Sequence, residues 1–279
     1  MNLKSSLWLV CLLCVLAVSA SANESRIGLD YVFPFQERFQ SKFWPRQFAA
    51  AGLKWVNFHL VSWADIEPQA PVGGVHVYKW KALDGCVRLW QAQGFDIVLT
   101  LRMKSGWFSG PIVYAPDVMG VVGRLHYRYS DRLPAPQFRK DLQAWMAAMV
   151  ERYDGDGKDD MPGLRAPVLH YQVGNEFANP MFWTGSVEDY GTYLKLMAPA
   201  AKGACPEVKI VSNGIRWNDA FEGDEGAAKF EERFKASLAR LPNDKWRRGW
   251  RRMRKMTEYT VAQAGVYDIL DGGGNGPYY

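Results

Sequence analysis

Residues 136–174 read PQFRKDLQAWMAAMVERYDGDGKDDMPGLRAPVLHYQVG and hold a helix pattern followed by a strand pattern. The first half carries apolar residues at helical spacing, with charged residues between them. The last seven residues form a short β-rich run that ends at Gly174. A strand reached through a helix pairs in parallel with the strand before that helix, because a parallel neighbour requires a crossover connection. This stretch therefore predicts one βα repeat of a parallel sheet.

The same alternation extends in both directions from this stretch. We expect strands at residues 27–30, 56–60, 96–101, 168–174, 208–212 and 267–270. Helices are expected at residues 43–51, 79–93, 136–153, 187–203, 227–241 and 246–264. Gly52, Gly94, Gly203 and Gly265 stand where glycine commonly ends a helix. The chain thus contains six consecutive βα units.

Two architectures fit alternating strands and helices: a closed (β/α)8 barrel and an open, doubly wound sheet. The open sheet commonly places a glycine-rich phosphate turn after its first strand. Here residues 31–35 read YVFPF, without glycine. The long aromatic-rich segments after the third and fourth strands suit the end of a barrel at which active sites form. We predict an α/β fold of (β/α)8 TIM-barrel type with about six βα units present.

The first 22 residues are typical of a cleaved secretory signal. An apolar run at residues 7–18 precedes the small-residue pattern Ala20-Ser21-Ala22. The run is shorter than the roughly 20 residues of a membrane-spanning helix, which is the alternative. We expect a secreted or periplasmic protein with one barrel domain at residues 23–279. Cys86 and Cys205 would remain after cleavage, and their pairing is left open.

The formal net charge of +5 comes from one basic run, KWRRGWRRMRK at residues 245–255. Such a run can bind nucleic acid or an anionic membrane. Trp246, Trp250 and Met253 recur within it at helical spacing, which favours an outer helix with a solvated basic face. We expect neither a nucleic-acid partner nor, after signal cleavage, a membrane partner.

The fourth strand ends in Asn175-Glu176, an amide beside a carboxylate. With GLKWVNFHLVSWADIEPQAP (52–71), FDIVLTLR (95–102), YQVGNEF (171–177) and KIVSNGI (209–215), the chain resembles the clan A glycoside hydrolases. That family of barrels includes cellulases, mannanases and β-galactosidases. The resemblance implies that Glu176 is the catalytic acid/base and that Asn175 binds a sugar 2-hydroxyl. An oligo- or polysaccharide with β-linkages is then the expected substrate.

Flat aromatic rings stack on the apolar faces of sugar rings, and polar groups bind the hydroxyls. Aromatic residues that follow strands are candidates for the first role, although core packing is the alternative for each of them. The full set of candidate substrate-binding residues is Asn175, His59, Trp63, Arg102, Trp107, Trp183, Asn213 and Trp217.

The connection before the fourth strand, YDGDGKDDMPG at residues 153–163, is rich in aspartate and glycine. Closely spaced carboxylates can bind Ca²⁺, and Asp154, Asp156 and Asp159 are the candidate ligands. A solvated turn is the alternative, and no other cofactor is expected.

Only one carboxylate of a catalytic pair is apparent. A retaining glycosidase needs two. In the resembling family the nucleophile is a glutamate after the seventh strand, whereas this sequence reaches six strands before DGGGNGPYY at 271–279. We therefore expect a C-terminally truncated hydrolase with weak activity or none. The alternative is a carbohydrate-binding protein that has lost the chemistry.

Overall fold

The structure is a computed structural model. It describes residues 27–104, 106–108, 131–179, 182–216 and 227–273. The expected signal peptide and Trp217 lie outside these residues.

Five parallel strands form the central sheet. They are β1 (Gly28–Val32), β2 (Trp55–Ser62), β3 (Asp96–Arg102), β4 (His170–Val173) and β5 (Lys209–Val211). Their order in the sheet is the order in the chain. A doubly wound sheet reverses direction at a switch point, whereas a barrel adds each strand beside the last. The sequential order therefore gives the sheet of a partial (β/α)8 barrel, as predicted.

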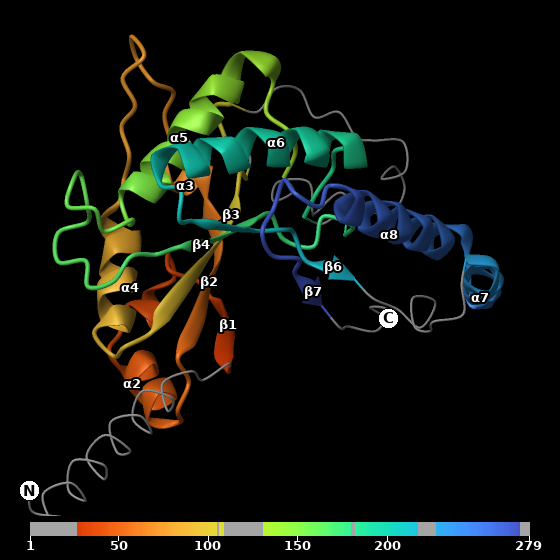
Figure 1. Cartoon of the computed structure of the whole chain (residues 1–279), viewed down its shortest axis with the longest axis horizontal. Helices are drawn as coiled ribbons and strands as arrows, with labels where there is room; N and C mark the ends of the chain where they lie inside the picture. Colours follow the sequence, from red (N-terminus) through yellow and green to blue (C-terminus); the bar gives the residue numbers. More distant parts are fainter. Residues whose placement is uncertain (1–26, 105, 109–130, 180–181, 217–226, 274–279) are drawn as a thin grey trace, which may run out of the picture.

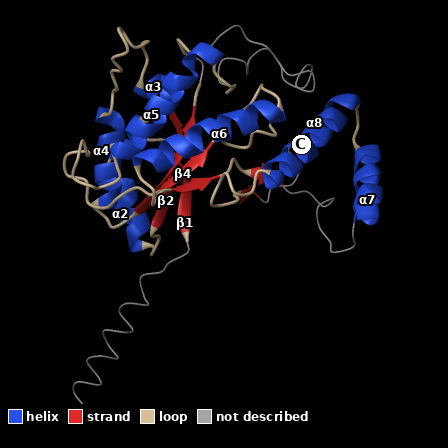
Figure 2. Cartoon of the chain, turned by 45° about the horizontal axis from the view of Figure 1, so that its top comes forward, coloured by secondary structure: helices blue, strands red, loops and turns tan. Residues whose placement is uncertain are grey.

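Helices cover one face of this sheet (Figures 1 and 2). The crossover helices are α2 (Phe43–Ala50), α4 (Lys81–Gln91), α5 (Arg139–Glu151) and α6 (Val187–Ala204). The short helical turns are η1 (Glu37–Gln40), α3 (Trp63–Ile66) and η2 (Pro136–Phe138). After β5 come α7 (Ala227–Arg240) and α8 (Asp244–Ala262), which share a small apolar cluster centred on Phe234 and Trp250.

The predicted sixth strand, residues 267–270, is only partly formed. Ile269 makes an isolated parallel bridge with Val211, so this segment does lie beside β5. Regular pairing occurs a few residues later, between β6 (Ile215–Arg216) and β7 (Gly272–Gly273). The position of this segment beside β5 was predicted correctly, but the residues that form regular strand pairing were not.

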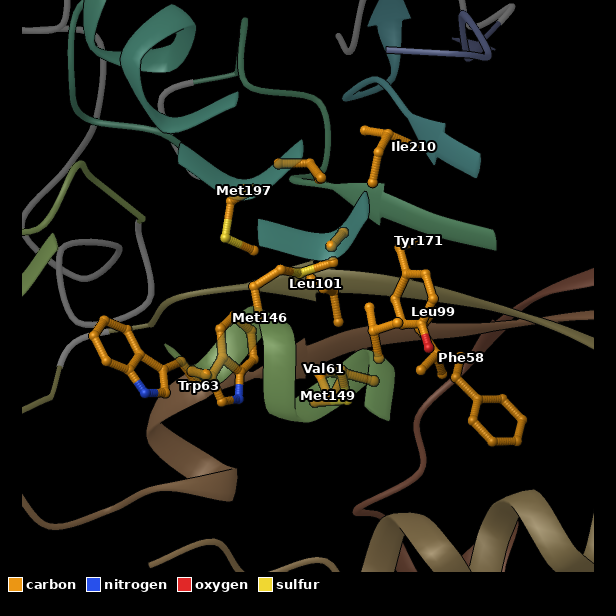
Figure 3. Packing of buried hydrophobic residues seen from close by; sticks show 14 of the residues in the cluster. Phe58, Val61, Trp63, Leu99, Leu101, Met146, Met149, Tyr171, Met197 and Ile210 are labelled. Atoms are coloured by element: carbon orange, nitrogen blue, oxygen red, sulfur yellow. The ribbon is translucent and has the colours of Figure 1, made fainter. Parts of the chain in front are cut away.

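The main core lies between the sheet and its helices. Leu99, Leu101 and Tyr171 point toward α5 and its Met146 and Met149, as Figure 3 shows. The intervening positions face the other way and are largely polar, for example Thr100. This alternation follows from the two-residue period of a strand. It places the apolar core outside the sheet and polar groups on its concave side.

Three details depart from or complete the sequence predictions. Gly203 lies within α6 rather than ending it. Cys86 and Cys205 are both buried and unpaired. Among the described residues, no helix combines the length and apolarity needed to cross a membrane.

Candidate active site

A cavity of about 550 Å³ lies on the concave side of the sheet. All five strands of the sheet contribute to its walls, with Asn57, His59, Val98, His170 and Gln172 among the lining residues. The loop after β4 adds Asn175 and Glu176, and the segment after α8 adds Asp271. Polar groups from separate parts of the chain therefore line the same cavity.

Irregularities in β1 and β2 turn extra side chains into this cavity. The register shifts between Leu29 and Val32 and again between Phe58 and Val61. A bulge re-aims the residues around it. As a result Leu29, Asp30 and Tyr31 all line the cavity, where a regular strand would present only alternate residues.

Asp30 and His59 form a pair on this wall, with Nδ1 of His59 3.6 Å from Oδ1 of Asp30. Burial acts to raise the pKa of Asp30, but His59, the Tyr31 amide and Asn57 outweigh it and hold that pKa below its usual value. His59 is 2% exposed, its Nδ1 faces Asp30, and its Nε2 has no hydrogen-bond partner among the described residues. A buried polar group without a partner is costly. His59 is therefore well suited to bind a ligand hydroxyl.

The Asn175-Glu176 pair lies at the cavity wall just after β4, as the sequence predicted. Asn175 is 6% exposed, and its side-chain nitrogen finds no hydrogen-bond partner in the described part of the chain. Glu176 has φ +44°, in the left-handed region that glutamate seldom adopts. Such strain costs on the order of 1–3 kcal/mol and persists only where the surroundings fix it.

Packing around Phe177 fixes this turn. The Phe177 ring stacks on Trp183 with centroids 4.4 Å apart. It also occupies the space above Gly174, where an added Cβ would lie 2.2 Å from the ring, and Gly174 itself has φ +90°. Only glycine fits there, so Gly174 and Phe177 together set the direction of the chain at Glu176.

Asn213 also holds this turn, which corrects its predicted role. It is fully buried and does not line the cavity. Its Oδ1 accepts a hydrogen bond of 3.1 Å from the Phe177 amide, and its Nδ2 donates to Thr260. Asn213 therefore positions the Glu176 loop and is not placed to bind substrate.

A buried arginine on α8 secures the rest of the loop. Arg252 is 1% exposed, and its Nη2 donates to the carbonyl oxygens of Trp183 and Gly185 at 3.0 and 2.9 Å, with Phe177 O at 3.4 Å. The basic face of this helix was expected to be solvated. That expectation is wrong for Arg252, because the carbonyl groups of the loop need a donor that water cannot supply there.

Asp271 lines the cavity near Glu176. A Cβ built on Gly214 would stand 2.9 Å from Asp271 Oδ2 and 3.7 Å from Glu176 Cγ, so both side chains approach one backbone position. Gln172 Nε2 donates to the same Oδ2 at 2.6 Å. A second carboxylate, Asp271, therefore lines the same cavity as Glu176. The sequence did not reveal it, because Asp271 is 95 positions away in a glycine-rich segment.

Three of the predicted sugar-stacking tryptophans, Trp63, Trp107 and Trp183, pack in or against the core. Trp63 is fully buried, stacks on Phe108 at 3.9 Å and donates from Nε1 to Glu67. Trp183 is equally buried, beneath Phe177. Trp107 is partly buried and donates to the Glu67 carbonyl. These three do not line the cavity, so the packing alternative applies to all of them.

Arg102 is engaged elsewhere. Its Nε and Nη2 donate to Asp131 Oδ1 at 3.2 and 3.1 Å, and both residues are buried. Asp131 also accepts from the Lys104 amide at 2.7 Å. This ion pair joins the end of β3 to the segment at Asp131, and Arg102 has a structural role in place of the predicted contact with substrate.

The aspartate turn brings together Asp154, Asp156 and Asp160, whose carboxylate oxygens lie within 4.8 Å of one another. Asp159, predicted as a ligand, is not in this group and is replaced by Asp160. Burial and the neighbouring charges of Asp156, Glu151 and Asp160 raise the pKa of Asp154. Two backbone amides, of Gly155 and Gly157, donate to Asp160 and already offset part of this charge.

Residues 35–197 of the 279 match the sequence model of glycoside hydrolase family 42, described as β-galactosidase. The chain belongs to this family. The matched region includes β2 to β4, Asn175 and Glu176 and most of α6. The resemblance to clan A glycoside hydrolases is thereby confirmed. A comparison with curated proteins gave no significant match.

Solved glycoside hydrolases are also similar to this family 42 chain. A β-galactosidase from Halorubrum lacusprofundi is 17% identical over 68% of this chain and 36% of its own, with a TM-score of 0.47. A family 39 β-xylosidase from Caulobacter crescentus is 16% identical over 91% of this chain and 54% of its own, with a TM-score of 0.43. An endo-1,4-β-mannanase from Rhizomucor miehei is 11% identical over 71% and 58%, with a TM-score of 0.46. The chain thus spans between about a third and somewhat over half of these proteins.

Proposed function

We propose that this family 42 chain binds β-linked saccharides in the cavity on the concave side of its sheet and hydrolyses their glycosidic bonds. Glu176 is the acid/base, which gives a proton to the leaving oxygen. Asn175 and His59 bind sugar hydroxyls. The family assignment supports the reaction class, and the cavity supports its location.

The observation that carries this proposal is the state of Asn175. Its side-chain nitrogen is buried at the cavity wall with no partner among the described residues, directly beside Glu176. A buried amide left without a partner costs on the order of 1–3 kcal/mol. A sugar hydroxyl in the cavity removes that cost. Binding energy is thus concentrated next to the carboxyl group that performs the chemistry.

The aromatic contribution to sugar binding comes from residues other than those predicted. Trp55 and Tyr31 line the cavity. Trp55 packs edge-on against His170 with centroids 5.2 Å apart, and Tyr31 contacts His59 at 4.2 Å. We assign the stacking role to these two rings. Both belong to or adjoin regular strands, where aromatic residues more often belong to the core.

The proposal is tested with nitrophenyl β-galactoside, β-xyloside, β-glucoside and β-mannoside. We expect release of nitrophenol from at least one of them. Glu176→Gln should abolish it, and Asn175→Ala should raise KM and lower kcat. Glu232→Gln, a change at an exposed glutamate on α7, is the control. If the chain bound saccharide, if Asn175→Ala removed that binding, and if no nitrophenol were released, the carbohydrate-binding alternative would be favoured instead.

Export from the cytoplasm is part of the same proposal. It rests on the sequence of residues 1–22 and suits a substrate found outside the cell. N-terminal sequencing of the exported chain should begin near Asn23. A retained Met1 would contradict it.

A further inference from the structure

We propose that Asp30 is a specificity-determining residue of this site, whose carboxylate accepts a hydrogen bond from a hydroxyl group of the bound sugar. The inference rests on the proposed function and deepens it, because it names a residue that selects among sugars. Asp30 lies in β1 and lines the same cavity as Asn175 and Glu176, which belong to the loop after β4.

Asp30 is the accessible member of the polar pair on this wall. Its side chain is 54% exposed, whereas the side chain of His59, 3.6 Å away, is 2% exposed. Both residues line the cavity. A ligand in the cavity therefore meets the carboxylate of Asp30 more readily than the imidazole of His59.

The backbone around this pair is strained on both strands. Tyr31, next to Asp30, has φ +64°, and Leu60, next to His59, has φ +60°. Both residues lie where the register of β1 and β2 shifts. Residues other than glycine seldom adopt this left-handed region, and such strain persists where the surroundings fix it, often at functional sites. The strain has a local result, because the Tyr31 amide donates to Asp30 Oδ1 at 2.8 Å.

The surroundings of Asp30 keep its carboxyl group ionised. Burial acts to raise its pKa. His59, the Tyr31 amide and Asn57 outweigh burial and hold the pKa below its usual value. The Oδ1 atom accepts from the Tyr31 amide and faces His59 Nδ1. A carboxylate has about four acceptor sites on its two oxygens, so sites remain for a ligand. A hydrogen bond to such a charged acceptor is stronger than one between neutral groups.

An ionised carboxylate imposes a chemical requirement on the sugar. It accepts hydrogen bonds and donates none, so the sugar must present a donor. A hydroxyl group has one, whereas a hydrogen or fluorine atom in its place does not. The side-chain nitrogen of Asn175 is a donor, and a fluorine atom can still accept weakly from it. Sugar analogues therefore distinguish a contact with Asp30 from a contact with Asn175.

Deoxy and deoxyfluoro sugars test this requirement. Methyl β-glycosides altered at carbon 3, 4 or 6 are titrated into the full chain, and their affinities are measured by calorimetry, which does not require turnover. We expect one position at which the deoxy and the deoxyfluoro analogues bind equally poorly. Both should bind about 10- to 100-fold more weakly than the unaltered sugar, as expected when a hydrogen bond to a charged group is lost.

Variants of Asp30 connect that position to this residue. In Asp30→Ala the unaltered sugar should bind as weakly as the analogues, and altering the hydroxyl group should cause no further loss. Asp30→Asn keeps a neutral acceptor and should show intermediate affinity. Glu37→Gln is the control, because it removes one charge from an exposed residue of η1 that does not line the cavity, and it should retain the full difference.

Two results would overturn the assignment and leave saccharide binding in the cavity intact. One is recovery of affinity by fluorine at all three positions, and the other is an unchanged penalty for the altered hydroxyl group in Asp30→Ala. The titrations of the parent chain need no variant, so they decide the question even if Asp30→Ala does not fold. If no sugar bound to the parent chain, the proposed function itself would be refuted, and this inference with it.

Discussion

Replacement of Arg252 by methionine tests whether a buried arginine holds the loop of the acid/base residue. The guanidinium donates to two loop carbonyls at 2.9 and 3.0 Å, and the third contact at 3.4 Å is weak. A hydrogen bond from a charged donor contributes roughly 1.5–3 kcal/mol. Two such bonds amount to roughly 3–6 kcal/mol, and the cost of burying the charge offsets part of this. We expect Arg252→Met to lower the free energy of unfolding by roughly 3 kcal/mol.

Arg251→Met is the matched control, because Arg251 is the adjacent residue of α8 and is exposed. A surface change of this kind usually stays within about 0.5 kcal/mol. Urea unfolding monitored by tryptophan fluorescence would compare both variants with the parent chain. Equal, small shifts for the two would show that Arg252 does not secure the loop between Phe177 and Gly185.

Three further outcomes follow from local features. Burial lowers the pKa of His170, so the unfolded chain binds a proton at this residue more readily than the folded chain does. The melting temperature should therefore fall as the pH drops below about 6.5, and the melting temperature of His170→Gln should depend less on pH in this range. Gly174→Ala should destabilise by more than about 2 kcal/mol in urea unfolding, since it adds a clash with Phe177 to the strain of positive φ. Gly94→Ala, with the same sign of φ and nothing within 4 Å, should show the smaller strain alone. Calcium should raise the melting temperature and EDTA reverse it; the same response in Asp156→Asn would contradict binding at the aspartate turn.

The sheet was predictable from the sequence because each strand and helix has a clear period and glycine marks most helix ends. Strands β1 to β5 and helices α2 to α8 fall where expected, apart from the short α3. The sixth strand was less predictable, since residues 267–270 run into glycines that weaken pairing. Its few bridges depend on contacts with β5 and β6 that no local pattern reveals.

The candidate site was predicted less completely than the fold. Asn175 and Glu176 were found because a strand end places them at the mouth of the barrel. Trp63, Trp107 and Trp183 were misassigned, since a position after a strand does not say whether a ring turns toward the cavity or under a helix. Asp271 was missed because its approach to Glu176 depends on Gly214 and on tertiary contacts. The available signal was Gln172, a polar residue at an inward-facing position of β4, which needs a hydrogen-bond partner in the cavity.

The central claim is that Glu176 acts on a β-linked sugar held in this cavity. Its most direct test is a comparison of kcat/KM for nitrophenyl β-glycoside hydrolysis between the chain and Glu176→Gln, with saccharide affinity measured by calorimetry in both. The account predicts that the substitution abolishes turnover and leaves saccharide affinity nearly unchanged. Turnover that persists in Glu176→Gln, or saccharide binding that is insensitive to Asn175→Ala, would contradict it.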